Sequence, residues 1–261
     1  MMACARPVVL ALASALLFAA TPAAAERLVA SLSMHRVLIT SNFTGAELVL
    51  FGTVERDAAS VGRRGGYDLV ATVSGPRQTM VTRLKERVFG IWVNTESRTF
   101  IEVPSYLAIL ATRPLETITN PDAQRRLQLG LAHTVLPQRI GPDIADVVQD
   151  DPFRSAFLRL KTDHRLYVEG LNAVTFLTPT LFRTSIPLPA EVPVGTYDVD
   201  VKLFADGAMI ARTNSAFEIV KVGFEQFVVT AANGYGILYG LATAAMALMT
   251  GWLASVAFRK D

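Results

Sequence analysis

The sequence predicts a mainly β protein with a helical insert: an immunoglobulin-like β-sandwich ectodomain followed by one C-terminal transmembrane helix. Short β-rich runs separated by turn residues fill residues 27–112 and 165–220, with a helical pattern between them. Residues 227–258 carry no charged side chain. Short, regularly punctuated strands are typical of a sandwich, and an uncharged run of this length is typical of a membrane span.

Residues 1–25 have the three parts of a secretory signal peptide. Arg6 is the only charged residue, an apolar stretch follows from Pro7 to Ala20, and small residues lead to Ala25. This stretch is short for an anchor, because a bilayer span takes about 20 apolar residues. We expect cleavage after Ala25, and an uncleaved N-terminal anchor is the alternative.

Residues 26–119 are predicted to form an N-terminal β-sandwich region. Its β-rich runs are separated by turn clusters, of which Asn94–Ser97 is one. Leu48 and Leu50 alternate with Val49 and Phe51, so this strand is apolar on both faces and is expected to be central.

Two features of this region are candidates for a binding role. Trp92 is a candidate for stacking on a sugar, but an aromatic residue on an apolar strand is more often part of the core. Arg83, Lys85 and Arg87 share one strand face, with Glu86 on the other. A solvated face is expected for these cations, and a partner-binding strip is the alternative.

Residues 120–162 are predicted to form a helical segment. Asn120 is the expected N-cap, ahead of a proline at the first helical position. A second helix is expected to start at Gly141-Pro142-Asp143, and helical spacing resumes after Asp151-Pro152. The sequence leaves open whether this segment is a spacer, a lid or a partner-binding arm.

Residues 163–222 are predicted to form a membrane-proximal, immunoglobulin-like β region. Apolar and polar side chains alternate along 194–204, and Asp206-Gly207 then turns the chain back. The sequence Pro193-x-Gly195-x-Tyr197 resembles the tyrosine corner of immunoglobulin-like domains. The pattern leaves open whether this region and residues 26–119 form one sandwich or two.

Residues 233–258 are predicted to form a single transmembrane helix, with residues 259–261 as a cytoplasmic tail. Arg259 and Lys260 follow the span directly, and positively charged residues favour the cytoplasmic side. Together with an exported N-terminus, this places the β regions on the outer side of the membrane. A buried helix of a soluble protein is the alternative.

Small residues recur on one face of the predicted span. They are Gly236, Gly240, Ala244, Ala247 and Gly251. Because small residues let two helix backbones approach closely, we expect helix–helix packing here, with a second copy or another membrane protein. Chance spacing in a span rich in alanine and glycine is the alternative.

The composition excludes several classes of function. Of 25 basic and 23 acidic residues, three and one lie outside 26–226, which leaves 22 of each sign within that range. Such a neutral domain provides no electrostatic case for nucleic acid as a partner. Cys4 is the only cysteine and lies in the predicted signal peptide, so no disulfide or thiolate metal site is expected in the mature chain.

No catalytic, cofactor-binding or metal-binding residues are expected. His35, His133 and His164 lie in different regions without ligand spacing. Asp150-Asp151 lacks the alternating oxygen ligands of a calcium loop and is expected to be a solvated helix end. No Gly-x-Ser-x-Gly elbow occurs, although a dispersed catalytic triad stays open.

Several motifs along the full chain are similar to those of a known family. They are Val103-Pro104-Ser105-Tyr106, Thr112-Arg113-Pro114-Leu115, Phe153-Arg154, Pro193-Val194-Gly195-x-Tyr197, Leu203-Phe204-x-x-Gly207, Tyr239-Gly240-Leu241 and Gly251-Trp252-Leu253-Ala254. The chain resembles a family of predicted single-pass transmembrane proteins of unknown function from alphaproteobacteria. The resemblance implies a cell-envelope protein and supplies no active-site residues. With the orientation above, we expect the bacterial inner membrane, a periplasmic N-terminal domain and a cytoplasmic C-terminus.

The leading hypothesis is a non-enzymatic, membrane-anchored envelope protein whose periplasmic β-rich domain binds or organises a partner. An accessory subunit of an inner-membrane transporter is one concrete form of it. The alternative is a membrane-anchored periplasmic hydrolase that acts on wall or lipid material. That alternative predicts a deep polar cleft holding an acidic or histidine pair. No cofactor is expected under the leading hypothesis.

Overall fold

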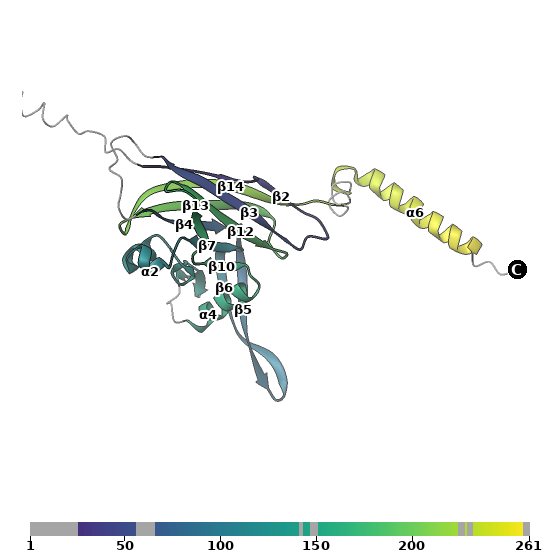
Figure 1. The fold of residues 1–261 in the computed structure, drawn as a ribbon. Helices are drawn as coiled ribbons and strands as arrows, with labels where there is room; N and C mark the ends of the chain where they lie inside the picture. Colours follow the sequence, from purple (N-terminus) through teal and green to yellow (C-terminus); the bar gives the residue numbers. More distant parts are fainter. Residues whose placement is uncertain are drawn as a thin grey trace, which may run out of the picture.

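A computed structural model describes residues 26–55, 66–140, 143–146, 151–223, 228 and 232–257 of the chain. The predicted signal peptide, residues 1–25, and the predicted tail, residues 259–261, lie outside the described residues. Strands dominate the structure, and one long helix stands apart from them near the C-terminus (Figure 1). The mainly β class with a C-terminal apolar helix is therefore confirmed.

The first sheet has four antiparallel strands in the order β1-β3-β12-β11. Its strands are β1 (Arg27–Leu32), β3 (Gly45–Glu55), β12 (Leu181–Pro189) and β11 (Val174–Phe176). The strand predicted to be central, β3, pairs on both sides. Its inward residues Leu48 and Leu50 are buried, whereas Phe51 on the outer face is 42% exposed.

The second sheet has six strands in the order β10-β7-β4-β13-β14-β2. Its strands are β10 (Tyr167–Gly170), β7 (Leu107–Ala111), β4 (Asp68–Ser74), β13 (Gly195–Ala205), β14 (Ala208–Lys221) and β2 (Arg36–Ile39). The β10–β7 and β14–β2 pairs are parallel. The sheet is amphipathic along β13, because Val199 and Val201 point into the core while Asp200 and Lys202 lie on the opposite face.

Both sheets contain strands from both β regions of the sequence. The β3–β12 and β4–β13 pairs join residues before position 112 to residues after position 180. Apolar side chains from the two sheets share one core, with Leu50 and Phe182 from the first and Leu69 and Val201 from the second. The two β regions therefore build one core between two facing sheets.

The Tyr197 side chain makes a hydrogen bond to the backbone four residues earlier in the chain. The Tyr197 hydroxyl donates to the Pro193 carbonyl oxygen over 2.6 Å. The ring is fully buried and stacks on Phe217, with 5.0 Å between ring centroids. This contact fixes the entry to β13, the strand at the centre of the second sheet.

Short helices cover the outer face of the second sheet. They are α2 (Leu115–Ile118), α3 (Pro121–Arg126), η1 (Leu131–His133) and α4 (Pro152–Asp163). The expected start at Asn120 is confirmed, because its side chain accepts a hydrogen bond from the Ala123 amide over 2.8 Å. Phe157 of α4 packs with Phe100 and Tyr167 in a second core beneath these helices.

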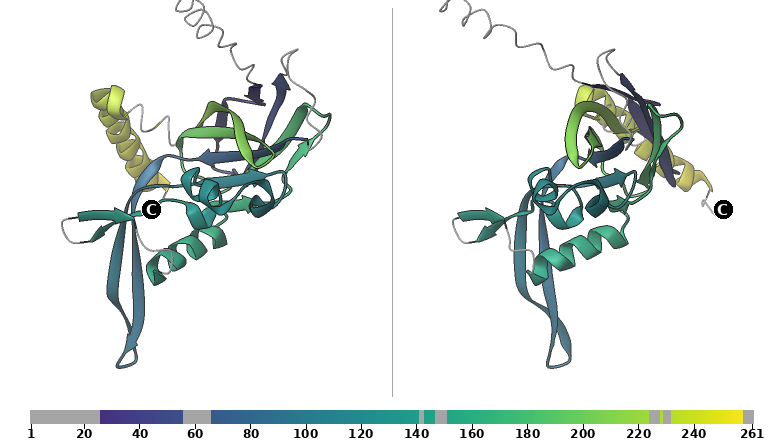
Figure 2. Two further views of the ribbon diagram at one scale, coloured as in Figure 1. Left: turned by 90° about the vertical axis from the view of Figure 1, so that its left-hand side faces the viewer. Right: turned by 60° about the vertical axis from the view of Figure 1, so that its left-hand side comes forward.

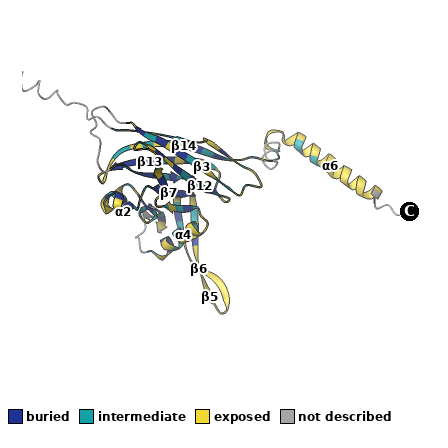
Figure 3. Ribbon diagram, in the orientation of Figure 1, coloured by how far each residue is buried: buried dark blue, intermediate teal, exposed yellow. Residues whose placement is uncertain are grey.

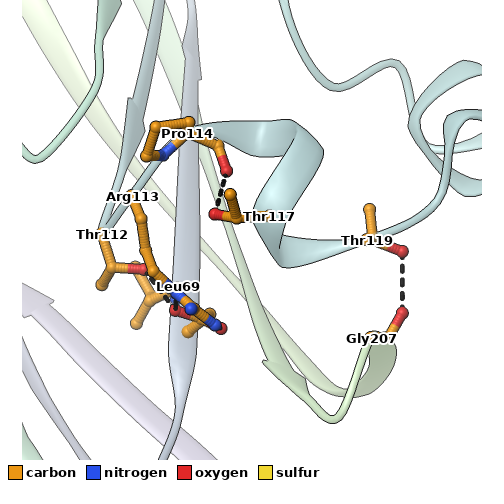
Figure 4. Close-up of polar contacts among 8 residues, drawn as sticks. Leu69, Thr112, Arg113, Pro114, Thr117, Thr119 and Gly207 are labelled. Atoms are coloured by element: carbon orange, nitrogen blue, oxygen red, sulfur yellow. Dashed lines mark hydrogen bonds and ion pairs between the residues drawn. The ribbon is translucent and has the colours of Figure 1, made fainter.

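Polar contacts tie α2 to the strands below it (Figure 4). Arg113, which precedes the helix, pairs with Asp68 at the start of β4. The Thr119 hydroxyl, at the other end of the helix, donates to the Gly207 carbonyl in the β13–β14 turn over 2.7 Å. The Thr112-Arg113-Pro114-Leu115 motif therefore joins the helical layer to the sandwich.

The second helix expected from Gly141-Pro142-Asp143 is wrong, and Gly141 and Pro142 themselves lie outside the described residues. A third sheet in the order β5-β6-β8-β9 occupies this part of the chain. Its strands are β5 (Arg77–Val88), β6 (Ile91–Pro104), β8 (Pro137–Ile140) and β9 (Asp143–Asp146). Strand β9 pairs with β8, which in turn joins β6. Pairing with an existing edge outweighs the weak helical spacing of so short a segment.

Candidate functional site

The feature of the structure that is least explained by the fold is a long hairpin made of β5 and β6. It projects away from both sheets and from the helical layer (Figures 1 and 2). Residues 83–97, which we call the arm, are all exposed, and the end of the hairpin is correspondingly uncovered in Figure 3. Nearer the body, Thr82 and Phe100 are buried and hold the base of the hairpin.

A tight turn at Phe89-Gly90 forms the end of the arm. The turn has two residues between the paired Val88 and Ile91, and both have positive φ, 50° for Phe89 and 87° for Gly90. Two positive φ values are typical of the type I′ turns that suit the twist of a hairpin. Glycine takes this conformation freely, but for a bulky residue it is strained. The Phe89 side chain is also 101% exposed.

The turn predicted at Asn94–Ser97 is therefore wrong. Asn94 pairs with Lys85 inside the hairpin, and Ser97 pairs with Arg83. A register shift between Leu84 and Lys85 shows that the polar run is accommodated as a bulge rather than as a turn.

The arm has one largely apolar face. Residues that pair across a hairpin point to the same side, and neighbours along a strand alternate. The face that is buried at Thr82 and Phe100 therefore continues outward through four exposed apolar residues and two glutamates. They are Leu84, Val88, Ile91 and Val93, with Glu86 and Glu96.

The opposite face of the arm is basic. It carries Arg83, Lys85 and Arg87, and Trp92 lies directly opposite Arg87. Over the residues that the structure describes, none of these three cations forms an ion pair. They are exposed, as expected for a solvated face.

The prediction that Trp92 belongs to the core is wrong, since 68% of the residue is exposed. The apolar composition around Trp92 is that of a buried strand, but β5 and β6 extend beyond the last element that could cover them. The sequence contained one usable indication, because Phe89-Gly90 places a tight turn between two runs of β-forming residues.

The five small residues predicted to pack against another helix all lie on α6 (Gly236–Ala257). At about 100° per residue, Gly236, Gly240, Ala244, Ala247 and Gly251 fall within an arc of about 80°. A Cβ atom added at any of the three glycines would meet no atom within 4 Å. This face is open to a partner helix, and association through it stays a prediction.

The histidine and acidic side chains of the described residues are dispersed. No group of three His, Cys, Asp or Glu side chains lies close enough among them to hold a metal ion. His164 Nδ1 lies 3.0 Å from Glu191 Oε2, but the two side chains are 57% and 68% exposed. An open surface pair of this kind differs from the deep polar cleft that the hydrolase hypothesis requires.

Helix α6 has the length and the composition of a membrane-spanning helix. Residues Gly236–Val256 have a mean hydropathy of 1.6 over the most apolar window, and none of that window is buried. The helix is long and apolar enough to cross a bilayer, and its outward-facing leucines have no cover from the rest of the described chain.

Comparison with known proteins gives a match to a family described as "Putative transmembrane protein (Alph_Pro_TM)" over residues 27–260. The chain belongs to this family. The match includes the two sheets, the arm and α6, and it confirms the resemblance found in the sequence motifs. The chain is accordingly a membrane protein with one candidate span near the C-terminus. No curated protein matches it.

Proposed function

We propose that this family member is a non-enzymatic, membrane-anchored envelope protein that binds a protein partner through the arm. The observation that carries the proposal is the apolar end of the hairpin. Phe89, Ile91 and Trp92 are 101%, 69% and 68% exposed. They lie at the end of the arm, with Ile91 on its apolar face and Trp92 on its basic face.

The exposed apolar side chains of the arm favour binding of a partner that packs against them. A two-stranded ribbon is only marginally stable in water unless a further strand or a packed face supports it. The distal part of the arm has neither among the described residues, although the side chains there are those of a buried strand. A contiguous exposed apolar surface is a common mark of an interaction site, and large aromatic residues dominate binding energy at such sites.

The pattern of charge favours a protein over a lipid surface as the occupant. Glu86 and Glu96 lie on the apolar face, among the residues that a bilayer would have to take up. A carboxylate is costly to bury in lipid, whereas the rim of a protein interface is polar and accommodates it. The cations on the opposite face provide a second, complementary surface for an acidic region of the same partner.

The membrane anchor suggests where the partner resides. A partner in the same membrane meets the arm at a high effective concentration, because both are confined to one surface. The predicted signal peptide and Arg259-Lys260 support a periplasmic β domain and a cytoplasmic C-terminus in the inner membrane. An accessory subunit of a transporter fits these properties.

The immunoglobulin-like character of the domain is part of this proposal. It is supported by the tyrosine corner at Tyr197 and by the β13–β14 hairpin, which turns at Asp206-Gly207. Immunoglobulin-like sandwiches frequently serve as binding scaffolds, but fold alone does not assign function.

The test is site-specific photo-crosslinking in intact cells, with an affinity tag after Asp261. A photoreactive amino acid at position 89 should capture one dominant membrane protein, identified by mass spectrometry. The matched control carries the same group at Leu177, which is exposed in a loop away from the arm, and should not capture it.

A second pair of variants tests the energetics. Replacing Phe89 and Trp92 by serine should abolish co-purification of the captured protein, whereas replacing the exposed Phe51 and Leu177 by serine should leave it unchanged. Crosslinks from position 89 to lipid alone, or no crosslinked product above the control, would contradict the proposal.

A further inference from the structure

A second site lies between the outer face of the second sheet and the helical layer. It is a cavity of about 390 Å³ whose floor is formed by β4, β13 and β14. The end of α3 and the start of β5 form part of its walls. This volume lies within the range of pockets that hold small molecules, and none of its lining residues belongs to the arm.

The floor holds a charged network that is buried at Lys202 and exposed at Arg212. Lys202, whose side chain is only 5% exposed, pairs with Asp200. Arg212 binds the same carboxylate, with Nε 2.7 Å from Oδ1 and Nη2 3.1 Å from Oδ2. Burial raises the pKa of Asp200, but hydrogen bonds from Arg212 and Lys202 outweigh it and hold this pKa below its ordinary value. The ionised carboxylate of Asp200 therefore forms ion pairs with both Lys202 and Arg212.

Two more cations line the same cavity. Arg77 lies at the start of β5, and its Nη1 donates to the Glu102 carbonyl oxygen over 3.0 Å. Arg126 lies exposed at the end of α3. Within the described part of the chain, neither guanidinium forms an ion pair. With four cations and one carboxylate among its lining residues, the cavity has a formal charge of +3.

An unpaired polar atom marks the same surface. The Thr72 hydroxyl oxygen is buried and has no hydrogen-bond partner in the described structure, and Thr72 lines the cavity. Thr72 is the residue paired with Asp200 in the β4–β13 pair. Buried polar groups are rarely left without partners, and a hydroxyl can donate to an anion.

We infer that this cavity binds a phosphate group of a small ligand. Four cations and one carboxylate line this cavity, so its field attracts an anion. Guanidinium groups match the tetrahedral, multiply accepting oxygens of phosphate, and a Lys ammonium and a Thr hydroxyl supply further donors. The volume exceeds that of a bare phosphate ion, which indicates a phosphate ester. This inference is independent of the arm and of its partner.

The test is isothermal titration of the full chain, in a neutral detergent, with inorganic phosphate and with glycerol 3-phosphate. We expect saturable binding of both, weakened by added sodium chloride, and tighter binding of the ester. Saturation distinguishes a site from the general stabilisation that phosphate gives by exclusion from protein surfaces.

The decisive variant is Arg126→Gln, because Arg126 is exposed and its loss leaves the network of Asp200, Lys202 and Arg212 in place. It should weaken binding of both probes by about 10-fold or more, as expected for one charge-assisted contact. The matched control is Arg125→Gln. Arg125 is the adjacent exposed arginine of the same helix, but it pairs with Asp122 and does not line the cavity.

Binding that is lost equally in both variants, or no saturable heat with either probe, would overturn the assignment. Saturable binding of citrate without binding of phosphate would also overturn it. Repeating the titration in nanodiscs that contain phosphatidic acid identifies the source of the group. Loss of glycerol 3-phosphate binding there indicates a lipid headgroup in the site, and unchanged binding indicates a soluble ester.

Discussion

Three buried tyrosines make hydrogen bonds to proline carbonyls, and comparing two of them gives a quantitative prediction. The Tyr167 hydroxyl donates to the Pro104 carbonyl over 2.7 Å, in a buried contact. The Tyr197 hydroxyl donates to the Pro193 carbonyl over 2.6 Å, in a contact that is only partly buried. Replacing either tyrosine by phenylalanine removes one hydroxyl and leaves the packing of the ring unchanged.

The two substitutions should differ in cost because of what they leave behind. The Pro104 residue is buried, so Tyr167→Phe leaves a buried acceptor without its donor, at a cost of about 2 kcal/mol. Pro193 is half-buried, so water partly replaces the lost donor and Tyr197→Phe should cost about 1 kcal/mol. For a chain of this size, about 1 kcal/mol corresponds to a decrease in Tm of about 2–4 °C.

The assay is thermal unfolding of the full chain in detergent, followed by near-ultraviolet circular dichroism. We expect Tm to fall by about 4–8 °C for Tyr167→Phe and by about half as much for Tyr197→Phe. An equal or larger decrease for Tyr197→Phe would refute the argument that burial of the acceptor sets the cost.

Three further outcomes are expected. Burial raises the pKa of Tyr106, Tyr167 and Tyr197 above its ordinary value. Their contribution to the free energy of unfolding is therefore complete below about pH 10. It should be lost as the pH rises further, in step with tyrosinate absorbance. Gly52→Ala should destabilise the chain by about 3 kcal/mol or more in thermal unfolding, because the new Cβ would lie 2.3 Å from the Val29 carbonyl oxygen and 2.6 Å from Phe182 Cζ; an unchanged Tm would contradict it. Ala244→Leu should reduce self-association of α6 in vesicles, measured by energy transfer, whereas Ala245→Leu, which lies about 100° further round the helix, should not.

Local chemistry explains which elements could be predicted from the sequence. The start of α3 depends on one side chain and the amide three residues on, so Asn120 ahead of a proline was sufficient. The corner at Tyr197 depends on a carbonyl four residues earlier. Features whose hydrogen-bond partners lie within a few residues of each other can be predicted from the sequence without knowledge of the fold.

The arm and the cavity depend on distant residues. Trp92 has the surroundings of a buried strand, and only the positions of other elements decide whether anything covers it. The cavity brings together Thr72, Arg126 and Asp200, which lie on three separate elements. The formal charges of residues 26–226 sum to zero. A local excess of positive charge appears only in the folded structure, where the second sheet meets the helical layer.

The interleaving of the two sheets has a consequence for biogenesis. Strands β3 and β4 emerge early in synthesis, but their partners β12 and β13 are made near the end. Long-range pairing of this kind slows folding and leaves strand edges unprotected in the meantime. Only 14 residues, 222–235, separate β14 from α6, so the domain acquires its last strands shortly before α6 is synthesised. For a β domain on the outer side of the membrane, as proposed above, closure of the sandwich and release of the helix into the bilayer are therefore expected to be nearly simultaneous, and a chaperone on that side would protect the unpaired early strands until then.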